Sequence, residues 1–492
     1  MVQIRHIVTL LPDNGPFRTN IADLSVVAVG NSLILVASTA QGGGLSSYRI
    51  SNSDSAIQAV DTRAYVGAIS HLADPELLVL GGAQPRVMPI GLGAAPGFGL
   101  TLLDSGHFGS RSGLQSSGLP AQTVAAETFS IGGKDYLVAN SRGELNFTLY
   151  RMGADNSLTK TGGSLLNPKS PFADAAISDF HITHMGGQVQ IFAVSALGNF
   201  ISSHTVRADG SITGGQFLGV ADGAGFNQPT ALTSVHVAGR DFLVVSSGSS
   251  SSLTVVLIRP DGSMTPIDHV IDEETTRFRG ATALDSVMLD GRAFIFVGGS
   301  DGGITLFTLT PDGRLLWLAN IVDTDQTSLA GVSALDAQVI GGKIMLFATS
   351  QTEGGISQFS IDPGPIGLTQ TVGNGVQHGT SGSDLMVAGD GTTRLFGGEG
   401  DDILIAGTTS VSMTGGAGAD IFVPMPIKGR IAILDFQVGI DRLDLSKLGM
   451  IRSTYQLVFF AAKLWNQDFL RRNGHRHLQR RQNHAAAVDV HQ

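Results

Sequence analysis

The sequence predicts an all-β protein in which a seven-bladed β-propeller is followed by a parallel β-roll. An apolar strand unit recurs about every fifty residues over residues 1–368, and a nine-residue register runs through residues 379–423. Helical periodicity is nearly absent. Glycine makes up 65 of the 492 residues, well above its usual share of about 7%. This abundance suits many tight turns between short strands.

The propeller prediction rests on seven copies of one unit, in which a glycine or polar turn precedes an apolar strand. Successive copies are separated by 44, 59, 54, 52, 52 and 51 residues. The second copy is the weakest, and the seven begin at Gly30, Asp74, Gly133, Gly187, Gly239, Gly291 and Gly342. Because a unit of four short strands repeated at this period is typical of a propeller blade, we expect seven blades.

A second turn supports four strands in each unit. It follows most of the apolar strands and is found at Asp155-Asn156, Asp209-Gly210, Asp261-Gly262 and Asp312-Gly313. Asp-Gly between apolar runs is a strong hairpin signal, so we interpret these aspartates as turn residues. The N-terminal run Ile4–Leu11 lines up with the end of a unit. We expect it to add an outer strand to the seventh blade and to close the ring.

The roll prediction rests on five consecutive blocks of nine residues: GTSGSDLMV, AGDGTTRLF, GGEGDDILI, AGTTSVSMT and GGAGADIFV. The eighth position is always large and apolar, occupied in turn by Met386, Leu395, Leu404, Met413 and Phe422. The sixth position of blocks one, three and five is aspartate, at Asp384, Asp402 and Asp420. If each block is half of one coil, these three aspartates lie on the same flank.

Carboxylates stacked on one flank repel one another unless a cation neutralises them. Calcium suits this position, because it takes six to eight oxygen ligands from carboxylates and backbone carbonyls. We expect two ions, one between blocks one and three and one between blocks three and five. The other flank has Thr393 and Val411 at the sixth position, and Asp390 is out of register. The alternative is a metal-free, glycine-rich solenoid or linker.

The predicted ligands fall into two groups. The carboxylates are those of Asp384, Asp402 and Asp420. The glycine-rich turns present backbone carbonyl oxygens as well, from Gly379, Ser381, Gly382, Gly397, Glu399, Gly400, Gly415, Ala417 and Gly418.

Blocks GGEGDDILI and GGAGADIFV resemble the hemolysin-type calcium-binding (RTX) repeat, and the stretch Ile433–Ser446 resembles the segment that caps rolls of this family. The resemblance covers about seventy of the 492 residues. It implies a β-roll over residues 379–449 that folds on binding extracellular Ca²⁺. It also implies a secreted, extracellular protein that leaves the cell by type I secretion, and the N-terminal residues lack the features of a signal peptide.

Composition excludes several classes of protein. Hydrophobic residues at 42% and charged residues at 15% indicate a folded chain. A net charge of −10 argues against nucleic-acid binding. No apolar run reaches the length of about eighteen residues that suggests a membrane span. There is no cysteine, so no disulfide can form.

No catalytic motif is present, neither H-E-x-x-H, G-x-S-x-G, a Walker loop nor C-x-x-C. His181 and His184 form H-x-x-H, but a spacing of three on a strand sends the side chains to opposite faces. The main hypothesis is a secreted calcium-binding protein whose propeller binds an extracellular protein or polysaccharide. The alternative is a secreted propeller hydrolase, lactonase-like or polymer-degrading, whose roll serves export; hairpins such as Gly303–Leu315 resemble those of lactonase-type propellers.

Two further segments complete the expected organisation. Residues 369–378 form a linker between propeller and roll. Residues 450–492 form a basic, poorly ordered tail, because the composition changes at about Phe459 and residues 464–492 carry five arginines and two aspartates. We expect this tail to depart from the family pattern and not to continue the roll.

Overall fold

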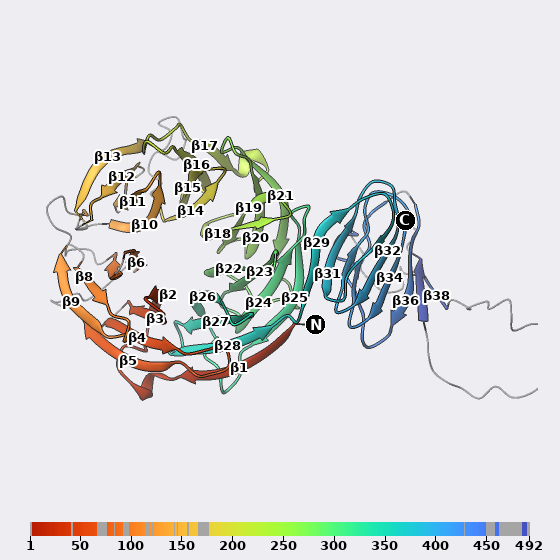
Figure 1. Cartoon of the computed structure of the whole chain (residues 1–492), viewed down its shortest axis with the longest axis horizontal. Helices are drawn as coiled ribbons and strands as arrows, with labels where there is room; N and C mark the ends of the chain where they lie inside the picture. Colours follow the sequence, from red (N-terminus) through yellow and green to blue (C-terminus); the bar gives the residue numbers. More distant parts are fainter. Residues whose placement is uncertain are drawn as a thin grey trace, which may run out of the picture.

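The computed structural model describes residues 2–40, 43–65, 76–82, 84–91, 98–113, 119–120, 123–141, 143–144, 146–154, 157–165, 177–427, 429–448, 458–461 and 485–489. Seven antiparallel four-stranded sheets form a ring, and a roll of two parallel sheets lies beside it (Figure 1). The described residues form no α-helix, only the 3-10 turns η1 (Pro12–Asn14) and η2 (Val220–Asp222). Neither is long and apolar enough to cross a membrane. The predicted fold class is confirmed.

In the first six blades, four consecutive strands run outward from the channel in chain order. Blades 1 to 3 comprise β2 (Ile21–Val29), β3 (Ser32–Thr39), β4 (Gly44–Ile50) and β5 (Gln58–Ala64); β6 (Glu76–Leu80), β7 (Arg86–Ile90), β8 (Phe98–Leu102) and β9 (Phe108–Gly113); and β10 (Thr123–Ile131), β11 (Lys134–Ser141), β12 (Asn146–Met152) and β13 (Leu158–Leu165). Blades 4 to 6 comprise β14 (Asp179–Met185), β15 (Gln188–Ser195), β16 (Phe200–Val206) and β17 (Gln216–Gly219); β18 (Pro229–Val237), β19 (Arg240–Ser247), β20 (Ser252–Ile258) and β21 (Met264–Ile271); and β22 (Ala283–Leu289), β23 (Arg292–Gly298), β24 (Gly303–Leu309) and β25 (Leu315–Val322).

Blade 7 joins the two ends of the propeller. It contains β26 (Val332–Ile340), β27 (Lys343–Ser350), β28 (Ile356–Asp362) and, as its outermost strand, β1 (Gln3–Leu10). β1 pairs antiparallel with β28, from Gln3 opposite Asp362 to Leu10 opposite Ile356. The predicted closure of the ring by the N-terminal strand is therefore confirmed.

The second repeat unit differs from the expected alignment. The described part of the apolar run from Asp74 forms β6, the first strand of blade 2, although the equivalent runs form second strands elsewhere. The true second strand is β7, which follows Gly82. Gly82 is 52 residues after Gly30 and 51 residues before Gly133, so the period is regular. The alignment by apolar runs fails in this unit because ELLVL, in a first strand, is as apolar as the second strands of the other blades.

A hydrophobic cluster fills each of the seven junctions between neighbouring blades. In every junction a polar side chain of one inner strand also hydrogen-bonds to the inner strand of the following blade. Carboxylates accept backbone N–H groups at five junctions: Asp23 from Leu77, Glu76 from Ala126, Glu127 from Ile182, Asp285 from Ala337 and Asp336 from Val26. The other two pair His181 with Ser234 and Thr233 with Ser286.

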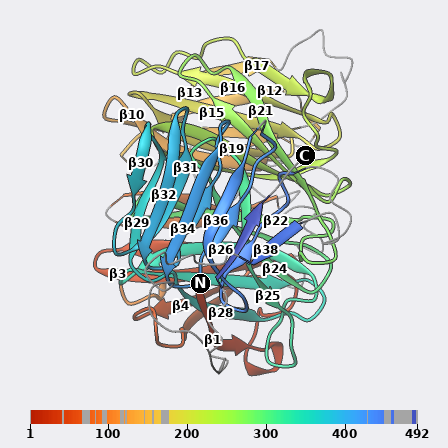
Figure 2. The ribbon, with the colours of Figure 1, turned by 90° about the vertical axis from the view of Figure 1, so that its right-hand side faces the viewer.

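The roll stacks parallel strands in two sheets (Figure 2). One contains β29 (Ile366–Val372), β31 (Ser383–Ala388), β33 (Ile403–Ile405), β35 (Ile421–Val423) and β37 (Arg442–Leu443). The other contains β30 (Gly375–His378), β32 (Thr392–Glu399), β34 (Val411–Ala417) and β36 (Ile431–Gln437). The five apolar residues at the eighth positions are all fully buried in or beside the core between these sheets. The period of eighteen appears as Leu385 opposite Ile403 and Ile403 opposite Ile421.

Two segments differ from the expected organisation. Residues 369–378, expected to be a linker, lie largely in β29 and β30, the first coil of the roll. This coil lacks the nine-residue motif, so pattern alone could not reveal it. In the tail, β39 (Ala485–Asp489) pairs antiparallel with β36, and β38 (Val458–Ala461) with β39, which extends one sheet of the roll. The rest of residues 449–492 lies outside the described residues, as do Asp155-Asn156.

Deleting residues 1–20 removes β1 and exposes the edge of β28. We expect the thermal midpoint of the propeller to fall by at least about 5 °C, because one strand pairing and its packing are lost. Differential scanning calorimetry measures this. An unchanged midpoint would show that β1 does not close the ring energetically.

The pKa of Asp285 provides a second test. Burial, with the nearby charge of Asp336, raises this pKa to about 8, whereas an unfolded aspartate titrates at about 3.9. The folded state therefore binds the extra proton, and its stability falls as pH rises through this range. Asp285→Asn keeps an oxygen acceptor for the Ala337 N–H but cannot titrate. We expect its stability to decline less between pH 5 and pH 9, by on the order of 1–2 kcal/mol.

Thermal unfolding at fixed calcium concentration over this pH range measures the difference. Asp104→Asn, at an exposed turn between β8 and β9, is the matched control and should follow the wild type. If the slope for Asp285→Asn equals that of the wild type, Asp285 does not contribute to the pH dependence.

Candidate metal centre

The three predicted aspartates lie along one edge of the roll, in the connections from one sheet to the other. Asp384 is the second residue of β31 and follows the loop from β30. Asp402 directly precedes β33, and Asp420 directly precedes β35. All three side chains are essentially buried, at 0%, 0% and 1% exposure. The residues predicted to supply carbonyl ligands lie on the same edge. Gly379, Ser381 and Gly382 precede β31. Gly397, Glu399 and Gly400 lie at or just after the end of β32, and Gly415, Ala417 and Gly418 at or just after the end of β34.

The aspartates form a continuous row through their backbones. Asp402 Oδ1 accepts the backbone N–H of Asp384 (2.8 Å), and Asp420 Oδ1 accepts that of Asp402 (2.9 Å). Asp441 Oδ1 accepts the N–H of Asp420 (3.0 Å) and extends the row by one coil. Each carboxylate therefore uses one oxygen to fix the coil before it.

The second oxygens of Asp402 and Asp420 lack partners. Both Oδ2 atoms are buried without a hydrogen bond, among the residues that the structure describes. A Cβ atom on Gly397 would overlap Asp402 Oδ2 and the carbonyl oxygen of Gly415, and one on Gly415 would overlap Asp420 Oδ2. The oxygens thus face small spaces that exist only because these residues are glycines. A buried carboxylate oxygen without a donor is costly, and a cation in this space would satisfy it.

The two loops beside these spaces have the same backbone shape. Gly398 and Gly416 have φ of +124° and +108°, and Gly400 and Gly418 have φ of +109° and +142°. Residues with a Cβ atom are strained at these φ values, so glycine is required at all four positions. The equivalent positions of the first loop, Thr380 and Gly382, do not have positive φ.

Asp384 differs from the other two aspartates. Its Oδ1 accepts the backbone N–H of Leu368 (2.5 Å), and its Oδ2 accepts that of Thr380 (2.6 Å). The Thr380 hydroxyl also contacts both oxygens, at 3.1 and 3.2 Å. Although Gly379 leaves a space here too, protein donors already satisfy this carboxylate. The Thr380 hydroxyl, where the motif has glycine, adds to these backbone donors.

Electrostatics distinguish the row from ordinary surface carboxylates. Burial, with the charges of Asp420 and Asp384, raises the pKa of Asp402 to about 8. Burial, with the charges of Asp441 and Asp435, raises the pKa of Asp420 to about 6. A bound cation would reverse both effects by stabilising the charged forms.

Side chains alone do not complete a site. Within the described ranges, no three His, Cys, Asp or Glu side chains converge closely enough to hold a metal ion. A cation at this edge therefore has to take backbone carbonyls as well, such as that of Gly415, which is typical of calcium.

Sequence reasoning missed two acidic residues. Asp441 continues the row, and Asp435 accepts the backbone N–H groups of Gly415 (2.9 Å) and Gly416 (2.8 Å). Both lie in the capping segment Ile433–Ser446. Asp441 follows Asp420 by 21 residues rather than 18, so the fixed period could not identify it. On the opposite edge, Asp390 accepts the Thr408 hydroxyl and is exposed.

The propeller has a second candidate site at one end of its channel. A cavity of about 840 Å³ lies where the first strands of six blades begin, and it is lined by Asp23, Glu76 and Asp179 among other residues. Burial raises the pKa of Asp23 and of Asp179 to about 7. Burial, followed by the charge of Asp179, also raises the pKa of Glu76. No Lys, Arg or His is among the residues that line this cavity in the described part of the chain.

The remaining candidates have structural roles. His181 contacts Ser234 of blade 5 and His184 contacts the Ser130 carbonyl of blade 3, so they point in opposite directions as predicted. Asp209 and Asp261 each accept a backbone N–H two residues ahead, from Ser211 and Ser263, which caps the hairpin turn.

The roll is similar to a known protein family. Residues 379–475 match the family described as Peptidase M10 serralysin C terminal. The matched range extends into the tail, past the break expected at about Phe459. No curated protein matches the chain.

Two solved structures are similar to the propeller. One is a protein from Lactobacillus plantarum, 15% identical over 70% of this chain and 84% of that chain, with a TM-score of 0.35. The other is a putative 6-phosphogluconolactonase from Bacteroides fragilis, 13% identical over 68% of this chain and 95% of that chain, with a TM-score of 0.43. Neither likeness is strong enough to bear on function. Residues 379–475 are therefore an RTX-type region similar to the serralysin C terminus, joined here to a seven-bladed propeller.

Proposed function

We propose that the roll binds two calcium ions and that this binding completes its folding outside the cell. The observation that carries the proposal is the pair of buried carboxylate oxygens, Asp402 Oδ2 and Asp420 Oδ2, that have no donor. Each faces a space bounded by glycine, where a Cβ would clash. Calcium would supply the missing positive charge and draw ligands from the carboxylates and the nearby carbonyls.

The proposed placement of the ions is revised from the prediction. An ion beside Asp402, near the Gly415 carbonyl, corresponds to the predicted site between blocks three and five. The second ion is proposed beside Asp420 Oδ2, rather than between blocks one and three. The reason is that both oxygens of Asp384 already accept hydrogen bonds.

Calcium dependence suits a secreted protein. Extracellular modules bind calcium with dissociation constants of roughly 10⁻⁴–10⁻³ M, and binding free energy becomes folding free energy when the site does not exist in the unfolded chain. In a low-calcium cytoplasm the later coils lack their metal ligand. We propose that the chain is exported in that state by a type I exporter, as the RTX resemblance implies, and that the propeller then binds an extracellular protein or polysaccharide.

Asp402 provides the sharpest test, because it lies in the middle of the row. In isothermal titration calorimetry of the full chain, we expect Asp402→Ala to lose at least one calcium ion per chain. Asp390→Ala, on the opposite edge of the roll, is the matched control and should keep the wild-type stoichiometry. Equal stoichiometry for Asp402→Ala and the wild type would refute the site.

A second pair of variants leaves every carboxylate in place. Gly397→Ala fills the space in front of Asp402 Oδ2, whereas a Cβ on Gly373, on the opposite edge, meets no atom within 4 Å. We expect Gly397→Ala to lose the same ion and Gly373→Ala to keep it.

The alternative function is a propeller hydrolase, and the acidic cavity is the observation that favours it. Carboxyls with pKa values near 7 can donate or accept a proton at neutral pH, as general acid–base catalysis requires. Asp23 and Asp179 meet this condition at the channel end.

A screen of ester, lactone and glycoside substrates tests the alternative, with the wild type compared against Asp179→Asn. If the cavity is catalytic, we expect an activity in the wild type that falls by at least about 100-fold in the variant. Asp209→Asn, in an exposed turn, should leave that activity unchanged. Activity that survives in Asp179→Asn would place the chemistry elsewhere.

A further inference from the structure

The sheet of the roll that faces the propeller is apolar on both sides. In blocks one, three and five, the residues that flank the buried eighth position are also apolar: Leu385, Val387, Ile403, Ile405, Ile421 and Val423. All six pack in one cluster with Leu316 of β25, the outer strand of blade 6. In blocks two and four these positions include Arg394, Ser412 and Thr414. One sheet of the roll is thus built for burial against the propeller.

The connection between the two parts is short. β28, in the last blade, ends at Asp362, and β29, the first strand of the roll, begins at Ile366. The first coil therefore starts beside the propeller, and little chain entropy is lost when it docks. Figure 1 shows β29 and β31 next to β25.

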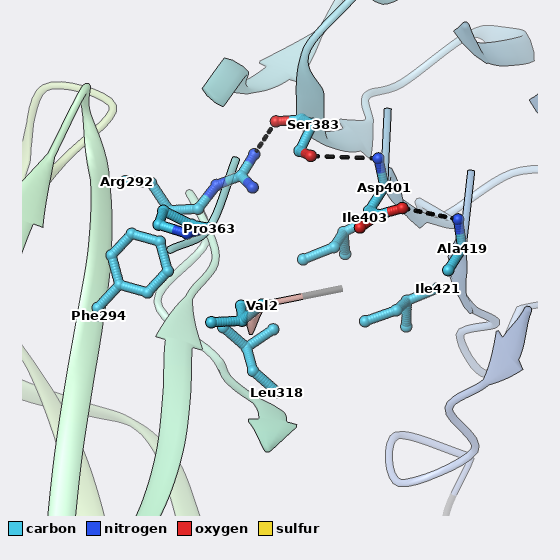
Figure 3. Close-up of a pocket in the computed structure, with 10 residues that line it drawn as sticks. All are labelled: Val2, Arg292, Phe294, Leu318, Pro363, Ser383, Asp401, Ile403, Ala419 and Ile421. Carbon is cyan, nitrogen blue, oxygen red and sulfur yellow. Dashed lines mark hydrogen bonds between the residues drawn. The ribbon is translucent and has the colours of Figure 1, made fainter. Parts of the chain in front are cut away.

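Arg292, the first residue of β23, reaches from blade 6 into this first coil. Its side chain is 4% exposed. Nη2 donates to the carbonyl oxygens of Ser383 (2.7 Å) and Leu368 (3.3 Å), and Nε lies 3.5 Å from Thr369 Oγ1. Figure 3 shows the guanidinium directed at Ser383, at a small cavity between propeller and roll.

The charge of Arg292 acts on the aspartate row. Burial lowers the pKa of Arg292 to about 10, and the carboxylates of Asp384 and Asp402 oppose this shift, so the side chain is charged at neutral pH. It lies at the end of the row where Asp384 has a full set of donors. At the other end, Asp402 and Asp420 each keep an unpaired oxygen. Arg292 thus places a positive charge beside the backbone of Ser383 at one end of the row, and no Lys or Arg of the described residues forms an ion pair with Asp402 or Asp420.

We propose that Arg292 takes the place of calcium at the first coil, so that β29 and β31 assemble on the propeller without metal and serve as the template on which the calcium-dependent coils form. This inference rests on the proposed calcium binding by the later coils. The guanidinium reaches acceptors in both β29 and β31 only when these strands are docked. These charge-assisted hydrogen bonds offset the water that the guanidinium loses on docking, and with the apolar contacts of the sheet they favour the docked strands without calcium.

Amide hydrogen exchange of the full chain, in excess chelator and in millimolar calcium, tests the proposal. For the wild type, we expect residues 383–388 to be protected in both conditions, and residues 403–405 and 421–423 to gain protection only with calcium. In Arg292→Met, exchange of residues 383–388 in chelator should become faster by a factor on the order of 10 to 100. Calcium should restore most of the protection.

Matched variants separate charge from general packing. Arg442 contacts Trp317 at 4.5 Å and donates to the carbonyls of Trp317 and Leu318, at the far end of the same interface. Arg442→Met should leave residues 383–388 protected in chelator. Arg292→Lys, which keeps the charge, should retain most of the wild-type protection. Protection of β19 and β20 in each variant reports whether the propeller is folded.

Several results would overturn the proposal. One is rapid exchange of residues 383–388 in the calcium-free wild type, and another is wild-type behaviour of Arg292→Met. Equal loss of protection in Arg292→Lys and Arg292→Met would also overturn it, because the charge of Arg292 would then not substitute for the metal. Failure of the proposed function looks different, because residues 403–405 and 421–423 of the wild type would then ignore calcium, whatever Arg292 does.

Discussion

The structure of the roll depends on carboxylates that are buried with only one oxygen satisfied. Asp402 and Asp420 each fix the preceding coil through a backbone N–H, and this bond brings the second oxygen into the interior without a donor. An unpaired buried carboxylate is among the most unfavourable groups in a protein. The glycines with positive φ and the nearby carbonyl oxygens fit the calcium coordination shell proposed above.

The propeller uses buried carboxylates in the opposite way. Asp285 and Asp336 each accept a backbone N–H from the next blade, and no metal is needed for their role. They hold the inner strands in register around the ring, together with the apolar clusters between blades. Buried carboxylates therefore join neighbouring blades where backbone donors are available, and in the roll they keep an oxygen for which the described residues supply no donor. The donor supply of the surroundings decides the role.

Much of this could be predicted from the sequence, because covalent spacing fixes strand register. The period of about fifty residues predicted the seven blades. The N-terminal apolar run predicted the outer strand β1, and the spacing of eighteen residues predicted that three aspartates lie on one edge of the roll. The remaining features depend on three-dimensional contacts. The donation from Thr380 to Asp384 requires the conformation of one loop, and Asp441 follows an irregular coil of 21 residues. The side-chain hydrogen bonds around the channel join residues of different blades, and a single sequence cannot show which residues pair.

The sequence also contains a pattern that indicates the contact between the roll and the propeller. In a roll exposed on both sides, residues flanking the buried position face water and are polar, as Arg394 and Ser412 are here. Their apolar counterparts in alternate blocks indicate a sheet shared by two hydrophobic cores. Since the same sheet carries the aspartate row at its edge, any change in coil geometry on metal binding also alters the contact with blade 6. The roll and the propeller thus share one apolar contact, which couples their stabilities.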